Sequence, residues 1–307
     1  MHGTLRFILA LMVALSHLGV SLPHFNQGVS AVVIFYILAG MVSYKLITNI
    51  YPNAPLAYYK DRIKRIYPFY LYSLIIAVLI YNLGVHSYFL SKEPTLFDWF
   101  ANLTIIPLSY YMYNSVDTFT FIPPAWSLGV ELQFYLLVPL LFTFKNFFYF
   151  TYYLSLFIFS LAILGLINTD YFSYRLLIGV LFIFLLGALI YKAKQKDEVS
   201  FILLRLTYFL IILLSLVIFM RGYRAPYNYE VLSSLLIGIP FLYLYTAFIP
   251  KSIDKYLGEL SYGMFLLHFP SLWFCQLFTN THPNIFIILF LSLLASMFGN
   301  KLLNKNI

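Results

Sequence analysis

The stretch LRFILALMVALSH, residues 5–17, places two ionisable side chains inside an otherwise apolar helical run. Arg6 and His17 are eleven residues apart, so both fall on one face of a helix, roughly 16 Å apart along its axis. Charged residues in a membrane cost about 2.5–3.5 kcal/mol each and mark functional sites by default. A second explanation stays open: Arg6 reaches the lipid headgroups, and His17 makes a hydrogen bond to another helix.

The rest of the chain is also strongly apolar. Its 307 residues are 62% hydrophobic and 10% charged, with a mean hydropathy of +0.86, which excludes a soluble globular protein. A membrane-spanning helix needs about 20 mostly apolar residues. The sequence predicts ten such spans, at 5–22, 28–47, 67–83, 126–144, 147–166, 176–191, 201–220, 229–249, 259–278 and 285–300. We therefore expect an all-α polytopic integral membrane protein that forms a single domain over residues 1–307.

The chain has a net charge of +8, and the positions of its basic residues agree with the predicted topology. With the N-terminus inside, fifteen Lys and Arg residues fall in cytoplasmic segments or at their edges. Only four lie on the opposite side, namely Lys92, Arg175, Arg221 and Arg224. This positive-inside bias predicts a multi-pass protein with both termini in the cytoplasm. We attribute the basic charge to topology and expect no nucleic-acid partner.

Cysteine usage and the first span exclude several other classes. Cys275 is the single cysteine, so an intrachain disulfide or a cysteine metal site is excluded, and the sequence has no other metal-ligand constellation. The first span has no small-residue cleavage site after it, so we do not interpret it as a cleaved signal peptide. We expect neither a metal nor a permanently bound cofactor.

The segment YYKDRIKRIYP, residues 58–68, carries a basic cluster just before the third span. Arg62 and Arg65 are three residues apart, on one face if the segment is helical, with Lys60 and Lys64 beside them. Two roles fit this pattern. The cluster determines topology and contacts anionic lipids, or it binds phosphate, for which the planar guanidinium fork is well suited.

The segment FIPPAWSLGVELQFYLLVPLL, residues 121–141, places a carboxylate inside the fourth span. The helix is expected to begin near Trp126, which puts Glu131 about one turn in, with Ser127 at i−4 on the same face. The helix dipole favours a carboxylate near this end. Glu131 is also at a depth similar to that of His17, so the two could form an oriented base; their contact is a hypothesis.

The segment LGELSYGMFLLHFP, residues 257–270, places His268 near the middle of the ninth span, just before Pro270. Tyr262 precedes His268 by six residues. A lone membrane histidine before a proline is more often a structural hydrogen-bonding residue than a catalytic one, and a catalytic role stays open as the alternative.

Together these segments resemble the acyltransferase family 3 integral membrane proteins over nearly the whole chain. The family-like pattern consists of Arg6 and His17 with ten residues between them, the glycine-flanked span GVSAVVIFYILAG (28–40), the R-x-x-R of Arg62 and Arg65, W-S-L-x-x-E (126–131) and S-Y-x-x-x-L-x-H (261–268). Ala39-Gly40 stands where Ser-Gly is common, and Ser30 where an acidic residue is frequent. These departures bear on packing, because the Arg, His and Glu positions are intact.

The resemblance implies an O-acyltransferase of the bacterial cytoplasmic (inner) membrane, with residues 1–307 as one transmembrane acyltransferase domain. Such proteins transfer an acyl group, most often acetyl from acetyl-CoA as co-substrate, to a sugar hydroxyl. The implied partners are the acyl-CoA donor, membrane lipids, and a glycan or lipid-linked sugar such as O-antigen, capsule or exopolysaccharide. The implied site residues are catalytic His17 and Glu131, donor-binding Arg6, Arg62 and Arg65, and accessory Trp126, Ser127, Tyr262 and His268.

Two chemical routes fit His17, whose unperturbed pKa of about 6.5 suits a base at neutral pH. It takes the proton of the acceptor hydroxyl, or it carries the acyl group itself. Tyr262 and backbone amides are candidate donors to the oxyanion. The long external loop 84–125 is rich in Tyr and Phe, which stack on sugars, so we expect it to determine the acceptor.

Three rival interpretations remain. A transporter or flippase for a glycan or anionic substrate also uses buried ionisable residues, although the chain shows no internal repeat of the kind many transporters have. A membrane-bound O-acyltransferase of the other large class also pairs a membrane histidine with an acyl donor. The retained ionisable residues argue against an inactive scaffold in a polysaccharide assembly complex.

Overall fold

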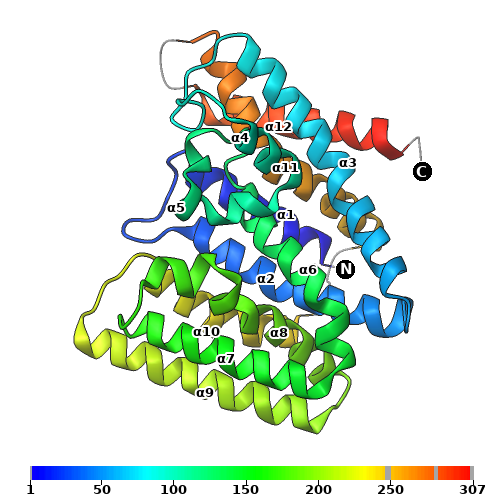
Figure 1. The fold of residues 1–307 in the computed structure, drawn as a ribbon, viewed down its shortest axis with the longest axis vertical. Coiled ribbons are helices and arrows are strands. Elements are labelled where there is room, and N and C mark those ends of the chain that lie inside the picture. Colours follow the sequence, from blue (N-terminus) through cyan, green and yellow to red (C-terminus); the bar gives the residue numbers. More distant parts are fainter. Residues whose placement is uncertain (1, 246–249, 280–282, 305–307) are drawn as a thin grey trace. The chain divides into compact units, whose positions relative to one another are not determined.

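The computed structural model describes residues 2–245, 250–279 and 283–304. The described residues are mostly helical and form no β-strand beyond two isolated bridges. Ten helices correspond to the ten predicted spans (Figure 1): α1 Gly3–His17, α2 Gln27–Lys45, α3 Pro55–Asn82, α6 Ala125–Thr143, α7 Lys145–Ile163, α8 Leu177–Lys194, α9 Glu198–Arg221, α10 Asn228–Leu244, α11 Lys251–Gln276 and α12 Ile285–Asn304. The predicted all-α polytopic membrane fold is confirmed.

The lengths and hydropathies of these helices differ. Within the described part of the chain, seven segments are long and apolar enough to cross a membrane, at 27–50, 55–82, 125–143, 145–163, 171–194, 198–221 and 285–303. Helices α1 and α10 are shorter, with 15 and 17 residues, whereas α11 has 26 residues but begins with several charged ones. Residues 246–249 of the predicted eighth span lie outside the described residues.

Helix α1 ends at His17, not at residue 22 as predicted. Gly19 has a φ of 84°, the left-handed conformation that glycine adopts without strain. The amide of Gly19 donates to the carbonyl of Ser16, and the amide of Val20 donates to that of Leu15, at 3.3 and 2.9 Å. This pattern is a Schellman motif. It places His17 in the last turn of α1, where its side chain is exposed.

Helix α3 begins at Pro55, twelve residues before the predicted third span, and continues through Pro68. The basic segment 58–66 is therefore helical, as its spacing allowed. The loop 84–125 is also more structured than a plain connection. It contains α4 Leu96–Thr104, the 3₁₀ turn η2 Ile106–Tyr110, the short α5 Tyr111–Asn114 and the 3₁₀ turn η3 Val116–Thr118.

The chain folds into two compact units. The first consists of Met1–Val20, Asp61–Gly129 and Ala247–Ile307, and the second of Ser21–Lys60 and Val130–Thr246. In the first unit α11 packs against both α1 and α12. In the second unit α2 and α8 pack closely, because a Cβ atom at Gly40 would lie 1.7 Å from the carbonyl oxygen of Phe184. Small residues allow such close approach of membrane helices.

Candidate functional site

Two predicted site residues of the first unit, His17 and His268, are in direct contact. Nδ1 of His17 lies 3.0 Å from Nε2 of His268. The two rings are nearly parallel, at 10°, with centroids 5.2 Å apart. A centroid separation this large with nitrogens this close means that the rings meet edge to edge, almost in one plane, as a linear hydrogen bond requires. His17 is exposed, whereas His268 is fully buried.

The contact depends on the register of α1 and α11, which run parallel. At the start of α1, Asp254 accepts hydrogen bonds from Thr4; at its end, His17 meets His268. From Thr4 to His17 the rise is about 20 Å, and from Asp254 to His268 about 21 Å. The two helices thus keep nearly one register over their whole contact. In a chain with ten spans, the first and the ninth cross the membrane in the same direction. The parallel packing of α1 and α11 therefore agrees with the predicted number of spans.

One aromatic ring packs against both imidazoles. The ring of Phe269 lies 5.2 Å from that of His17 and 5.0 Å from that of His268, centroid to centroid. Phe89, from the loop 84–125, packs edge-on against Phe269 at 5.2 Å. Neither phenylalanine was predicted as a site residue, because a single aromatic residue in a chain with 32 Phe gives no signal.

The basic segment of α3 contacts the same helix, α11. The guanidinium carbon of Arg65 lies 5.8 Å from the centroid of the Tyr262 ring, and the Tyr262 hydroxyl donates to the carbonyl of Ile66 at 3.2 Å. Arg62 forms an ion pair with the neighbouring Asp61. The structure therefore brings Arg65 and Tyr262 together. The Tyr262 hydroxyl, which was predicted as a candidate hydrogen-bond donor to the oxyanion, donates to a backbone carbonyl in this structure.

The remaining predicted residues lie in α1 and α6. Arg6 is half-buried, eleven residues before His17 on α1. Trp126 is half-buried in the first turn of α6, and the hydroxyl of Ser127 donates to the carbonyl of Pro124 at 3.0 Å. The carboxylate of Glu131 accepts a hydrogen bond from the hydroxyl of Tyr135.

His17 belongs to the first unit and Glu131 to the second. Their contact therefore stays a prediction. The second unit also contains a charged cluster that was not predicted. Arg175 forms an ion pair with Asp170 at 2.7 Å and lies over the rings of Tyr174 and Tyr227, at 5.1 and 5.5 Å.

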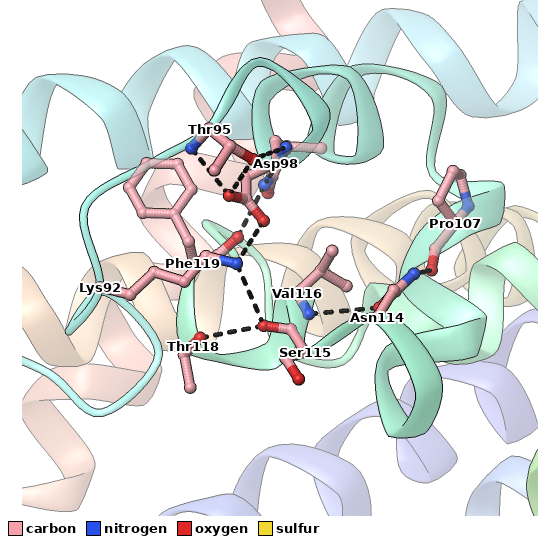
Figure 2. Close-up of polar contacts among 10 residues, drawn as sticks. Lys92, Thr95, Asp98, Pro107, Asn114, Ser115, Val116, Thr118 and Phe119 are labelled. Carbon is pink, nitrogen blue, oxygen red and sulfur yellow. Dashed lines mark hydrogen bonds and ion pairs between the residues drawn. The ribbon is translucent and has the colours of Figure 1, made fainter.

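The loop 84–125 is held by a polar network (Figure 2). Asp98 accepts from both the amide and the hydroxyl of Thr95, in a capping box, and forms an ion pair with Lys92 at 2.7 Å. Asn102 donates to the carbonyls of Asp98 and Phe119, at 2.9 and 3.0 Å. Burial alone would raise the pKa of Asp98, but hydrogen bonds from Lys92 and Thr95 outweigh it and hold that pKa below its usual range.

Among the residues that the structure describes, no three His, Cys, Asp or Glu side chains cluster as metal ligands would. The chemistry present at the site is that of an accessible imidazole, oriented by a buried one, in the unit that also contains Arg62, Lys64 and Arg65. Such an imidazole acts as a general base or as a nucleophile.

Comparison with known proteins agrees with this chemistry. A model of acyltransferase family 3, described as an acyltransferase domain, matches residues 4–300, a range that covers most of both units. A protein of Aquifex aeolicus (strain VF5), described as "Uncharacterized protein", is 42% identical over 183 residues, which cover 57% of this chain and 80% of that protein. No solved structure matches the chain significantly. The chain belongs to the acyltransferase family 3 of integral membrane proteins.

Proposed function

We propose that this membrane acyltransferase transfers acetyl from acetyl-CoA to a sugar hydroxyl of a bacterial surface glycan. The proposal rests most directly on His17. It is an exposed imidazole at the end of α1, oriented by a buried His268. In the overall reaction the hydroxyl oxygen bonds to the acetyl carbon, the C–S bond breaks, and CoA leaves as the thiol with the proton of the hydroxyl.

The basic segment of α3 supports an anionic nucleotide donor. Lys60, Lys64 and Arg65 are exposed, and guanidinium groups bind phosphate bidentately. Helix α11 contacts this segment through Tyr262 and contacts His17 through His268. These two positions are six residues apart, about 9 Å along the helix axis. In coenzyme A the phosphates and the thioester are likewise separated, by the pantetheine arm.

The loop 84–125 supports a sugar acceptor. Tyr88 and Tyr113 are exposed there, and aromatic faces of this kind stack on sugar rings. The loop also contacts the site, because Phe89 packs on Phe269, which packs on His17. A sugar bound by the loop would therefore be delivered near the imidazole. O-antigen, capsule, exopolysaccharide and lipid-linked sugars are the acceptor classes that we propose.

We further propose that the protein resides in the bacterial cytoplasmic membrane with both termini in the cytoplasm. The parallel packing of α1 and α11 supports this topology, since both would enter from the cytoplasmic side. The two units would act as a single transmembrane acyltransferase domain, which agrees with the one family match over residues 4–300.

The test uses purified protein in proteoliposomes with acetyl-CoA labelled in the acetyl group. Extracted lipid-linked glycans from several bacterial hosts serve as acceptors, and both CoA release and label in the glycan are counted. We expect release of CoA that depends on an added glycan and equals the label transferred. Absence of any glycan-dependent release, with acetyl-CoA and with longer acyl-CoA donors, would contradict the proposal.

A further inference from the structure

The hydrogen bonds around His268 determine which nitrogen of His17 is reactive. Nδ1 of His268 lies 3.2 Å from the carbonyl oxygen of Met264. A carbonyl oxygen only accepts, so Nδ1 of His268 carries a proton. His268 is fully buried, where a charged imidazole would be costly, so the ring is neutral and its Nε2 is an acceptor.

The proton between the two rings therefore belongs to His17. Its Nδ1 donates to Nε2 of His268 across the 3.0 Å contact. A neutral imidazole carries one N–H, so the lone pair of His17 is on Nε2. From this chain of contacts we infer that His268 is a positioning residue: it fixes the Nδ1–H tautomer of His17 and makes Nε2 the reacting nitrogen. The inference deepens the proposed function and rests on it.

The assignment applies to both chemical routes. As a base, Nε2 takes the proton of the acceptor hydroxyl while the hydroxyl oxygen attacks the thioester carbon. The C–S bond then breaks, and the proton passes from Nε2 to the leaving sulfur, so that CoA leaves as the thiol. As a nucleophile, Nε2 forms an N–C bond with the acetyl carbon, the C–S bond breaks, and CoA leaves as the thiolate. The acceptor oxygen then bonds to that carbon, the N–C bond breaks, and the hydroxyl proton goes to the thiolate. In both routes the positive charge that develops on His17 is shared with His268 through the Nδ1–H.

Phe269 makes the arrangement specific to one rotamer. It packs against both imidazoles, so the His17 ring cannot turn over without losing that contact and the hydrogen bond. The partners lie on two helices whose register is fixed at the other end by Thr4 and Asp254. Supporting contacts of this kind orient a catalytic imidazole, and losing them commonly reduces activity by about 10–100-fold in metal sites, where the effect is best measured.

Three substitutions of His268 separate positioning from packing. In His268→Gln the amide oxygen reaches about the place of Nε2 and accepts from His17. In His268→Asn the shorter amide reaches only the place of Nδ1, and His268→Leu has no acceptor. We expect kcat about 100-fold lower for Asn and Leu but within about tenfold of wild type for Gln, since general-base catalysis contributes 10²–10⁴. The KM for acetyl-CoA and the melting temperature should be the same in all three.

Equal activity of the Gln and Asn variants, or full activity of the Leu variant, would overturn the inference. A second measurement does not depend on activity or on the variants of His268. In wild-type protein labelled with ¹⁵N-histidine, the His17 signals are identified by their loss in His17→Ala. We expect the unprotonated nitrogen to couple strongly to both ring C–H protons, as Nε2 does. A proton on Nε2 would overturn the tautomer even if acetyl transfer were observed, and an inactive wild type with the expected tautomer would instead contradict only the proposed function.

Discussion

Asp254 accepts hydrogen bonds from both the backbone amide and the hydroxyl of Thr4, at 2.9 and 3.0 Å, and so joins the first turn of α11 to the first turn of α1. It satisfies an amide that the start of a helix leaves without an intrahelical partner, and it adds negative charge at the positive end of the helix dipole. The same two helices carry His268 and His17 about 20 Å further on. A contact far from the site therefore sets the geometry of the site.

Asp254→Asn should reduce both stability and activity without touching the imidazoles. Burial alone would raise the pKa of Asp254, but hydrogen bonds from the backbone and side chain of Thr4 and from Gly3 outweigh it and lower that pKa. Because the pKa of Asp254 is lower in the folded state than in the unfolded state, its stabilisation is fully present above the unfolded-state pKa. The stabilisation is lost as the pH falls through the folded-state pKa. The melting temperatures of wild type and Asp254→Asn, measured in detergent, should differ at pH 7 and converge in acid.

The control is a double-mutant cycle with Thr4→Ala, since only directly coupled residues show a non-additive effect. Thr4→Ala removes the hydrogen bond of the hydroxyl but leaves that of the backbone amide, so its melting temperature reports the hydroxyl contact alone. If the double variant loses less than the sum of the two single losses, Thr4 and Asp254 act as a pair. Strictly additive losses would contradict the role given to this contact.

Gly40→Ala should prevent folding of the second unit. The added Cβ would lie 1.7 Å from the carbonyl oxygen of Phe184, so α2 and α8 would have to separate, and even modest overpacking of a core costs about 1–3 kcal/mol. Gly238→Ala is the matched control, because the nearest atoms to its Cβ would be those of the Ile34 and Ile37 side chains, at ordinary distances of 3.4 and 3.7 Å. Size-exclusion profiles should show loss of the monodisperse peak for Gly40→Ala alone. Similar profiles for both variants would contradict the close packing.

Asp98→Asn should loosen the loop 84–125. The substitution keeps the shape but removes the charge that pairs with Lys92, and hydrogen bonds to charged groups contribute on the order of 2 kcal/mol. Because the pKa of Asp98 is lowered in the folded state, wild type should lose the same stabilisation as pH falls through that value. Limited proteolysis would show faster cleavage within the loop in Asp98→Asn at pH 7, and a smaller difference in acid. Equal cleavage rates at pH 7 would show that the network does not hold the loop.

Arg65→Ala should raise the KM for acetyl-CoA by about tenfold or more while kcat changes little, since a charge-assisted contact contributes about 1.5–3 kcal/mol. The KM of Arg65→Lys should lie between the values for wild type and Arg65→Ala, because lysine keeps the charge but not the planar guanidinium fork. The matched control is Arg205→Ala, since Arg205 is also exposed and lies over an aromatic ring, that of Phe201 at 5.6 Å, but in the second unit. An unchanged KM for Arg65→Ala would remove the basic segment from donor binding.

The hydropathy pattern was enough to predict the helices, because lipid requires about 20 apolar residues for each span. Each of the ten predicted runs corresponds to a helix, and the chief error, the end of α1, follows from the Schellman motif at Gly19. The interior of the loop 84–125 was not predictable in this way. Its helices are held by specific pairs such as Lys92 and Asp98, which leave no periodic signal.

His17 and His268 could be named as candidates from the sequence, but their arrangement could not be predicted. Spacing along one helix places Arg6 and His17 on a face, but it does not tell which helix lies opposite. Glu131 was the predicted partner of His17 because of its depth, and His268 was expected to be mainly structural; the structure puts His268 against His17. That contact requires α1 and α11 to be parallel neighbours, although some 250 residues separate their contacting residues along the chain.

The proposal that His17 carries out acyl transfer predicts a large difference between wild type and His17→Ala in proteoliposomes, compared at matched amounts of folded protein. Labelled acetyl-CoA is the donor, and label is counted in the glycan and on the protein. We predict transfer by wild type and a loss of at least about 100-fold in His17→Ala, with label trapped on wild-type protein if the acyl group passes through Nε2. Equal transfer by His17→Ala would show that His17 has no part in the reaction.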